Sequence, residues 1–141
     1  MDDFRTQLGA VIDDLLARGV VPVFMVVDLP GAAQIKKVRG AESLEQFKQS
    51  ATNAVTSASS GCDAFSYGDE RIIAILGGFD RLKTFAVADK LRRSLPFLAQ
   101  SYDFVLQPEF DILEYDAASG VAGLMHQLVA IRNRDDQRDI A

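Results

Sequence analysis

The chain has 141 residues, of which 48% are apolar, so its length and composition suit one domain with a sizeable core and exclude a disordered chain. The net charge of −5 disfavours nucleic-acid binding, which needs a basic field to neutralise phosphates. No apolar stretch is long enough to span a bilayer, so we expect a cytoplasmic protein without membrane insertion.

Hydrophobic spacing predicts three helices and one strand in the first half of the chain. The spacing over Phe4 to Leu16 predicts an amphipathic helix that stops at Gly19. Val20 to Val27 is almost continuously apolar, as expected for a strand buried on both faces of a sheet. A short helix over Ala32 to Val38 comes next. Ser43 to Ala58 then begins with a capping-box pattern and predicts a longer helix.

A hairpin and a further helix are expected next. Ala64 to Tyr67 and Arg71 to Leu76 have strand-like composition, with a turn between them. The helix that follows is expected to end at Pro96. Its inward side is predicted to consist of Leu82, Phe85, Ala88, Leu91 and Leu95.

The last part of the chain completes the predicted domain. Tyr102 to Leu106 and Phe110 to Tyr115 have the composition of strands, and Val121 to Val129 that of a final helix. Residues 133–141 are expected to form a polar tail. The predicted fold is therefore a single α/β domain over residues 1–132, with a central mixed or antiparallel sheet that contains a hairpin and is flanked by helices.

Acidic residues at two strand ends are the candidates for chemistry. Asp69 and Glu70 lie on the turn of the predicted hairpin, and Asp28 ends the buried strand. Carboxylates at such positions can hold a metal ion or transfer protons. They are also ordinary solvent-facing turn residues, so both interpretations stay open.

The chain resembles GGDEF domains, the diguanylate cyclase family, which have a palm-like fold. Phe65 to Leu76 is similar to the family signature R-Y-G-G-[D/E]-E-F and the apolar strand after it. Asp28 to Gly40 lines up with D-x-D-x-F-K-x-I-N-D-x-x-G and keeps the first Asp, the Ile and the Gly. Ala88 to Leu95 looks like the helix A-E-x-L-R-x-x-[IL]. The resemblance thus covers nearly the whole chain and implies an α+β palm-like fold.

The resemblance also implies roles for individual residues. In active members, Mg²⁺ ions bridge the nucleotide phosphates, held by one carboxylate that ends the first strand and one in the hairpin. Asp28 and Asp69 match these metal positions, so they would approach each other at one end of the sheet. Asp69 and Glu70 would be the catalytic acids of an active enzyme. The implied nucleotide-binding residues are Lys36, Glu45, Gly68 and Arg132.

Several positions depart from the family pattern. If the alignment has no gap, Tyr67 replaces the first Gly of the doublet, where a phenol would obstruct guanine and ribose; if one Gly is deleted, Ser66 to Gly68 match R-Y-G and the turn is one residue shorter. Arg71 replaces the Phe that ends the signature. Lys36 replaces the Asn that recognises guanine and cannot accept a hydrogen bond. Ala32 and Ala33 stand where the family has the Phe and Lys that support phosphates. We therefore expect no cyclic di-GMP synthesis and no required cofactor, with Mg²⁺ as the one candidate ion.

These departures favour a degenerate GGDEF-like domain that acts as a non-catalytic signalling, regulatory or dimerisation module of the bacterial type. Its partner would be another protein or a second copy, and guanine nucleotide stays a candidate ligand. One alternative is an active diguanylate cyclase, or a related cyclase that uses GTP or ATP. Another is a receiver-like domain with Asp28 as phospho-acceptor, although the all-parallel sheet of receivers leaves no place for the hairpin.

Overall fold

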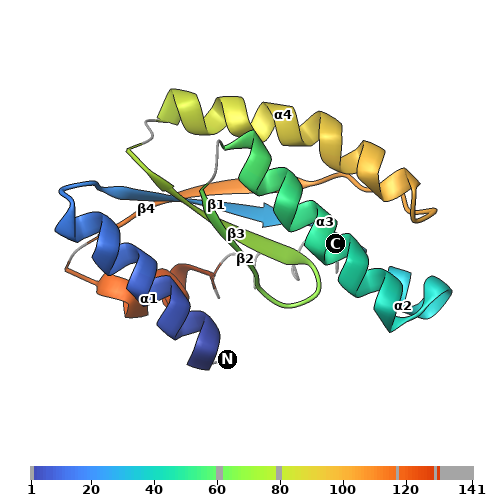
Figure 1. Cartoon of the computed structure of the whole chain (residues 1–141), viewed down its shortest axis with the longest axis horizontal. Helices are drawn as coiled ribbons and strands as arrows, with labels where there is room; N and C mark the ends of the chain where they lie inside the picture. The colour runs from blue at the N-terminus through green and yellow to red at the C-terminus, as the bar shows by residue number, and fades with distance from the viewer. Residues whose placement is uncertain (1, 60–61, 79–80, 117, 129, 131–141) are drawn as a thin grey trace.

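The computed structural model describes residues 2–59, 62–78, 81–116, 118–128 and 130. They form a four-stranded sheet with helices packed against it (Figure 1). The strands are β1 (Pro22–Asp28), β2 (Asp63–Ser66), β3 (Arg71–Gly77) and β4 (Glu109–Glu114). The helices are α1 (Asp2–Ala17), α2 (Gln34–Arg39), α3 (Ala41–Ala58) and α4 (Arg81–Gln100). Residues 120–128 are also helical.

The sheet is antiparallel throughout, with the strand order β2-β3-β1-β4. The predicted hairpin is confirmed as the β2–β3 pair, and β1 is a central strand as expected. Asp28 lies opposite Arg71 on one neighbouring strand and opposite Glu109 on the other. The receiver-like alternative is wrong, because a receiver sheet has only parallel strands.

Both faces of the sheet are covered, and this explains the unbroken apolar sequence of β1. Met25 and Val27 belong to a buried cluster that includes side chains of α2, α3 and α4. Phe24 and Val26 alternate with them and belong to a second cluster, formed with α1 and the helix over residues 120–128. Figure 1 shows that last helix beside α1. None of the described helices is long and apolar enough to cross a membrane.

Three predictions about element boundaries were wrong. Ser43 does not cap α3, because the helix already begins at Ala41 and the Ser43 hydroxyl donates to the Arg39 carbonyl. Pro96 lies inside α4, which continues to Gln100 because Ala99 is fully buried and packing outweighs the lost backbone hydrogen bond. Residues 102–106 form no strand, since this segment folds back in turns that bond to the end of α4.

The inward side of α4 was also partly mispredicted. Leu91 and Leu95 are buried as expected, but Leu82 is 78% exposed and Phe85 is 47% exposed. In the first turns of the helix the buried position is taken by Thr84, whose side chain is fully covered. Two large apolar side chains therefore lie on the surface.

We predict that Val26→Asp prevents folding. Val26 is fully buried, and an unpaired carboxylate there costs several kcal/mol against a total stability of about 5–15 kcal/mol. Val21→Asp is the matched control, because Val21 precedes β1 and is 64% exposed. Thermal unfolding followed by circular dichroism should show a cooperative transition for the control alone. Cooperative melting of Val26→Asp near the parent temperature would contradict the burial of β1.

Candidate functional site

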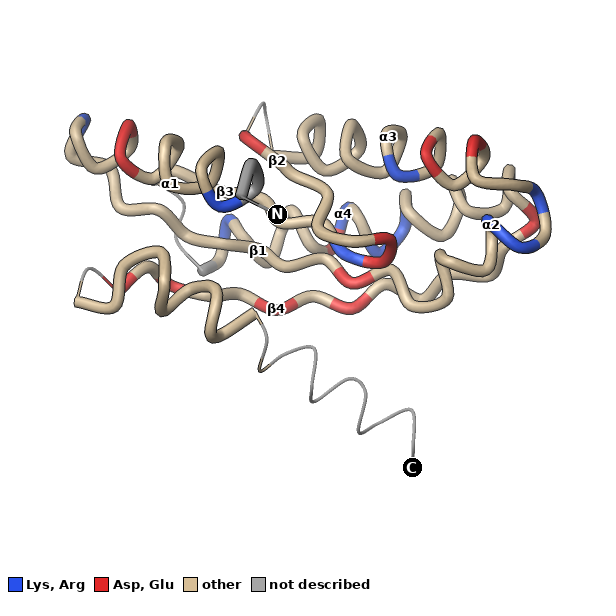
Figure 2. The backbone as a smooth tube through the Cα atoms, turned by 90° about the horizontal axis from the view of Figure 1, so that it is seen from below, with Lys and Arg blue, Asp and Glu red and all other residues tan. Residues whose placement is uncertain are grey.

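The acidic turn of the hairpin lies against the end of β1. Its three residues, 68–70, are closed by a hydrogen bond of 2.8 Å from the Tyr67 amide to the Arg71 carbonyl. The Leu29 amide donates to the Glu70 carbonyl at 2.7 Å, which ties the turn to the residue after β1. Gly68 has a φ of 72°, a left-handed conformation that glycine adopts without strain. Figure 2 shows the acidic residues of this turn and of β4.

Asp28 forms a buried ion pair with Arg71. The Nε atom of Arg71 lies 2.6 Å from Oδ1 of Asp28, and the two residues are opposite each other in the β1–β3 register. Asp28 is only 5% exposed. The Nη1 atom of Arg71 also donates to the Leu128 carbonyl at 3.1 Å, so the pair connects β1, β3 and the last helix. The guanidinium therefore provides a positive charge at the carboxylate that the sequence suggested as a metal ligand.

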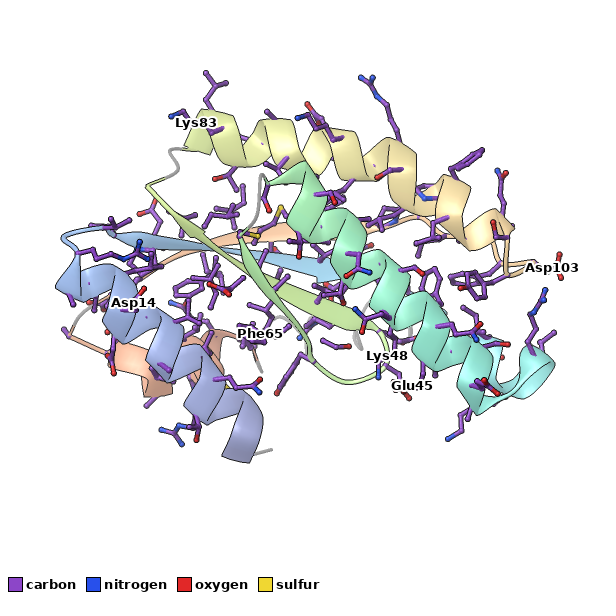
Figure 3. All side chains as sticks on the ribbon, in the orientation of Figure 1. Asp14, Glu45, Lys48, Phe65, Lys83 and Asp103 are labelled. Carbon is purple, nitrogen blue, oxygen red and sulfur yellow. The ribbon has the colours of Figure 1, made fainter. Side chains whose placement is uncertain are left out.

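Asp69 and Glu45 share one lysine of α3. The Nζ atom of Lys48 lies 3.2 Å from an Asp69 oxygen and 3.3 Å from a Glu45 oxygen. Figure 3 shows Glu45 and Lys48 on α3 beside the hairpin turn. The Lys48 side chain is mostly covered, whereas both carboxylates are largely exposed. The Lys48 ammonium group thus lies between the candidate metal ligand Asp69 and the candidate nucleotide-binding residue Glu45.

Glu70 holds the backbone just before α2. Its Oε2 atom accepts a hydrogen bond of 3.1 Å from the Ala33 amide. Ala33 is one of the two alanines that stand where the family pattern has phosphate-supporting residues. The second acidic side chain of the turn therefore faces α2, and its carboxylate takes up a backbone donor at that position.

The other predicted nucleotide-binding residues that the structure describes lie on different elements. Lys36 is exposed on α2, and Gly68 is exposed on the turn. Arg132 lies outside the described residues. Tyr67 packs against the apolar cluster on the α1 side of the sheet.

The candidate metal ligands Asp28 and Asp69 have different side-chain partners. The backbone brings Asp28 and the turn to the same end of the sheet, as expected. The Asp28 side chain, however, contacts Arg71 on the side of the last helix, whereas Asp69 contacts Lys48 of α3. The part of the chain that is described contains no group of three or more His, Cys, Asp or Glu residues suited to a metal ion. A divalent ion that bound Oδ1 of Asp28 would have to displace a buried guanidinium.

Sequence reasoning missed the two basic residues that organise this site. Arg71 was noted only as a departure from the signature, and Lys48 was not singled out. The spacing of Glu45 and Lys48 on one helix was a usable signal, because residues three apart lie on the same helix face. The pairing of Arg71 with Asp28 depends on the β1–β3 register, which the sequence does not reveal.

An antiparallel sheet covered by helices, with an acidic hairpin turn at the end of its central strand, defines a palm-like α/β domain. No family model and no curated protein matches the sequence. Among solved structures, the GGDEF domain of DgcB from Caulobacter crescentus, in complex with c-di-GMP, is similar with a TM-score of 0.71 and 12% identity, over 95% of this chain and 82% of that one.

Two further solved structures have the same arrangement. The active GGEEF domain of a diguanylate cyclase from Vibrio cholerae gives a TM-score of 0.62 at 13% identity, over 84% of this chain and 77% of that one. A sensory box/GGDEF family protein from Caulobacter crescentus CB15 gives 0.62 at 18% identity, over 96% and 92%. The protein is therefore a GGDEF-like domain in its fold, and the resemblance read from the sequence is confirmed at that level.

We predict that Arg71→Met destabilises the protein by about 3–5 kcal/mol, because it leaves the buried Asp28 carboxylate without its cation. The double variant Asp28→Leu/Arg71→Met should recover most of that loss, since apolar replacement of a buried pair is often nearly neutral. Urea unfolding measures both changes.

Arg18→Met is the control for this prediction. Arg18 pairs with Asp14 at the surface, where both side chains are more than half exposed, so its loss should cost less than about 1 kcal/mol. Equal losses for Arg71→Met and Arg18→Met would show that the Asp28–Arg71 pair is not buried in solution.

Proposed function

We propose that this protein is a non-catalytic GGDEF-like module that acts in signalling through contacts with other proteins. The observation that carries the proposal is that the chain itself provides a partner for each candidate carboxylate of the site. Asp28 is paired with Arg71, Asp69 with Lys48, and Glu70 with the Ala33 amide. A site whose carboxylates are already paired with a cation or hydrogen-bonded is poorly prepared to bind a metal ion and a nucleoside triphosphate.

The cost of opening the site supports the same proposal. Two-metal phosphoryl transfer needs carboxylates that are free to coordinate both ions and the phosphates. At Asp28 the ion would compete with a hydrogen-bonded guanidinium in a buried position, and removing one partner of such a pair is strongly unfavourable. Each misplaced contact in a catalytic arrangement typically costs about 10²-fold in rate. Several such losses together would leave no measurable turnover.

We predict no cyclic di-GMP synthesis when the purified protein is incubated with GTP and Mg²⁺. Calorimetry should likewise show no difference in Mg²⁺ heats between the parent protein and Asp28→Asn, because Oδ1 of Asp28 is already paired with Arg71 in a buried position. Product formation can be followed by chromatography. The parent protein and the Asp69→Ala variant are assayed in parallel at the same concentration.

The alternative is an active cyclase, and the same assay decides between the two. Asp69 lies on an exposed turn and could be reached by a ligand if Lys48 moved away. Robust turnover of GTP or ATP that disappears in Asp69→Ala would overturn the non-catalytic proposal. Turnover that survives Asp69→Ala would point to a contaminating enzyme and leave the proposal standing.

A further inference from the structure

The outer face of α4 exposes large apolar side chains at both ends of the helix. Leu82 is 78% exposed, Phe85 47% and Phe97 75%, whereas the opposite side of the helix is buried against α3 and the sheet. Figure 1 shows α4 along the upper margin of the molecule. Leu82 and Phe97 are fifteen residues apart, which is about 22 Å along a helix axis.

The same helix is strongly basic in an acidic protein. The sequence of α4 contains five Lys or Arg residues and one Asp, a net charge of +4. Because the whole chain carries −5, the remaining residues carry −9. A positive field is thus concentrated on one element, and it favours approach of a negatively charged partner.

Two of these cations have no internal partner. Arg92 is engaged, because it lies 2.5 Å from an Asp89 oxygen and 5.1 Å from the centre of the Phe110 ring. Lys90 and Arg93 form no ion pair with any residue that the structure describes. Their spacing from Leu82 and Phe97 places all four on one side of the helix. The outer face of α4 therefore presents an apolar anchor at each end and two unpaired cations between them.

We propose that the outer face of α4 binds an acidic amphipathic helix of a partner protein. This inference rests on the proposed function, since it gives the chemistry of the protein that the module would contact. A helix fits because the two anchors lie in line and a second helix can pack along α4 over that whole length. Acidic side chains on the partner would pair with Lys90 and Arg93, while its apolar side chains cover Leu82 and Phe97.

Two other occupants fit the same face less well. A second copy that docked its own α4 here would bring two helices of charge +4 together, which is repulsive. An anionic bilayer would attract the basic residues, but the apolar anchors are interrupted by charged residues instead of forming the continuous apolar face of a membrane-surface helix.

The test uses a synthetic helical peptide as long as α4, 20 residues, with leucines near both ends of one side, glutamates between them on that same side and a single tryptophan. The protein contains no tryptophan, so indole fluorescence reports on the peptide alone. We expect saturable binding that weakens as salt is added. Lys90→Glu/Arg93→Glu should weaken binding about tenfold or more, and Leu82→Ser/Phe97→Ser should weaken it at all salt concentrations.

The matched control is Arg5→Glu/Lys37→Glu, which makes the same change in charge at exposed positions of α1 and α2. The control should bind as the parent does. Equal weakening in both charge-reversed variants, or no saturable binding, would overturn the inference. So would tighter binding to phosphatidylserine vesicles than to the peptide, or self-association that Lys90→Glu/Arg93→Glu abolishes.

Failure of this inference is distinguishable from failure of the proposed function. Turnover of GTP by the parent protein would overturn the non-catalytic role and leave the peptide result unaffected. Absence of both turnover and peptide binding would overturn only the role of α4.

Discussion

The buried ion pair between Asp28 and Arg71 is the constraint on which one end of the sheet, the end that contains the candidate site, depends. It joins the last residue of β1 to the first residue of β3, and Arg71 extends to the Leu128 carbonyl of the last helix. Three elements distant in sequence are therefore fixed by one guanidinium. Because an isolated charge is costly in a buried position, neither partner can leave without the other being compensated.

The pair also explains how this palm-like fold accommodates a buried carboxylate at the end of β1. A cation is needed beside a buried carboxylate, and here the chain provides it from the neighbouring strand. The apolar side chains of β1 and β3 do not depend on the identity of that cation, since they pack into the two clusters on either face. Likeness to GGDEF domains at 12–18% identity is consistent with this separation, because packing specifies the fold and a few polar residues specify the site.

The sequence was most informative where one local signal decides the structure. The continuous apolar run of β1 predicted a central strand, and the glycine-containing acidic turn predicted the β2–β3 hairpin. The prediction failed where tertiary packing outweighed a local preference. Pro96 should end a helix, but the burial of Ala99 carries α4 onward. The partners of Asp28 and Asp69 could not be read from the chain at all, because they depend on register and on the approach of α3.

The misprediction of α4 shows why exposed residues carry functional information. Spacing alone placed Leu82 and Phe85 in the core, since a helical pattern does not distinguish a side that meets the protein's own sheet from a side that meets another molecule. The structure buries the face with Thr84, Leu91 and Leu95 instead. Leu82 is mostly exposed and Phe85 is about half exposed, and both lie on the helix that carries a net positive charge in an otherwise acidic chain. An acidic, partly apolar partner surface that covers α4 would explain both the exposed apolar side chains and the positive charge of this helix. The fold of the domain alone explains neither of them.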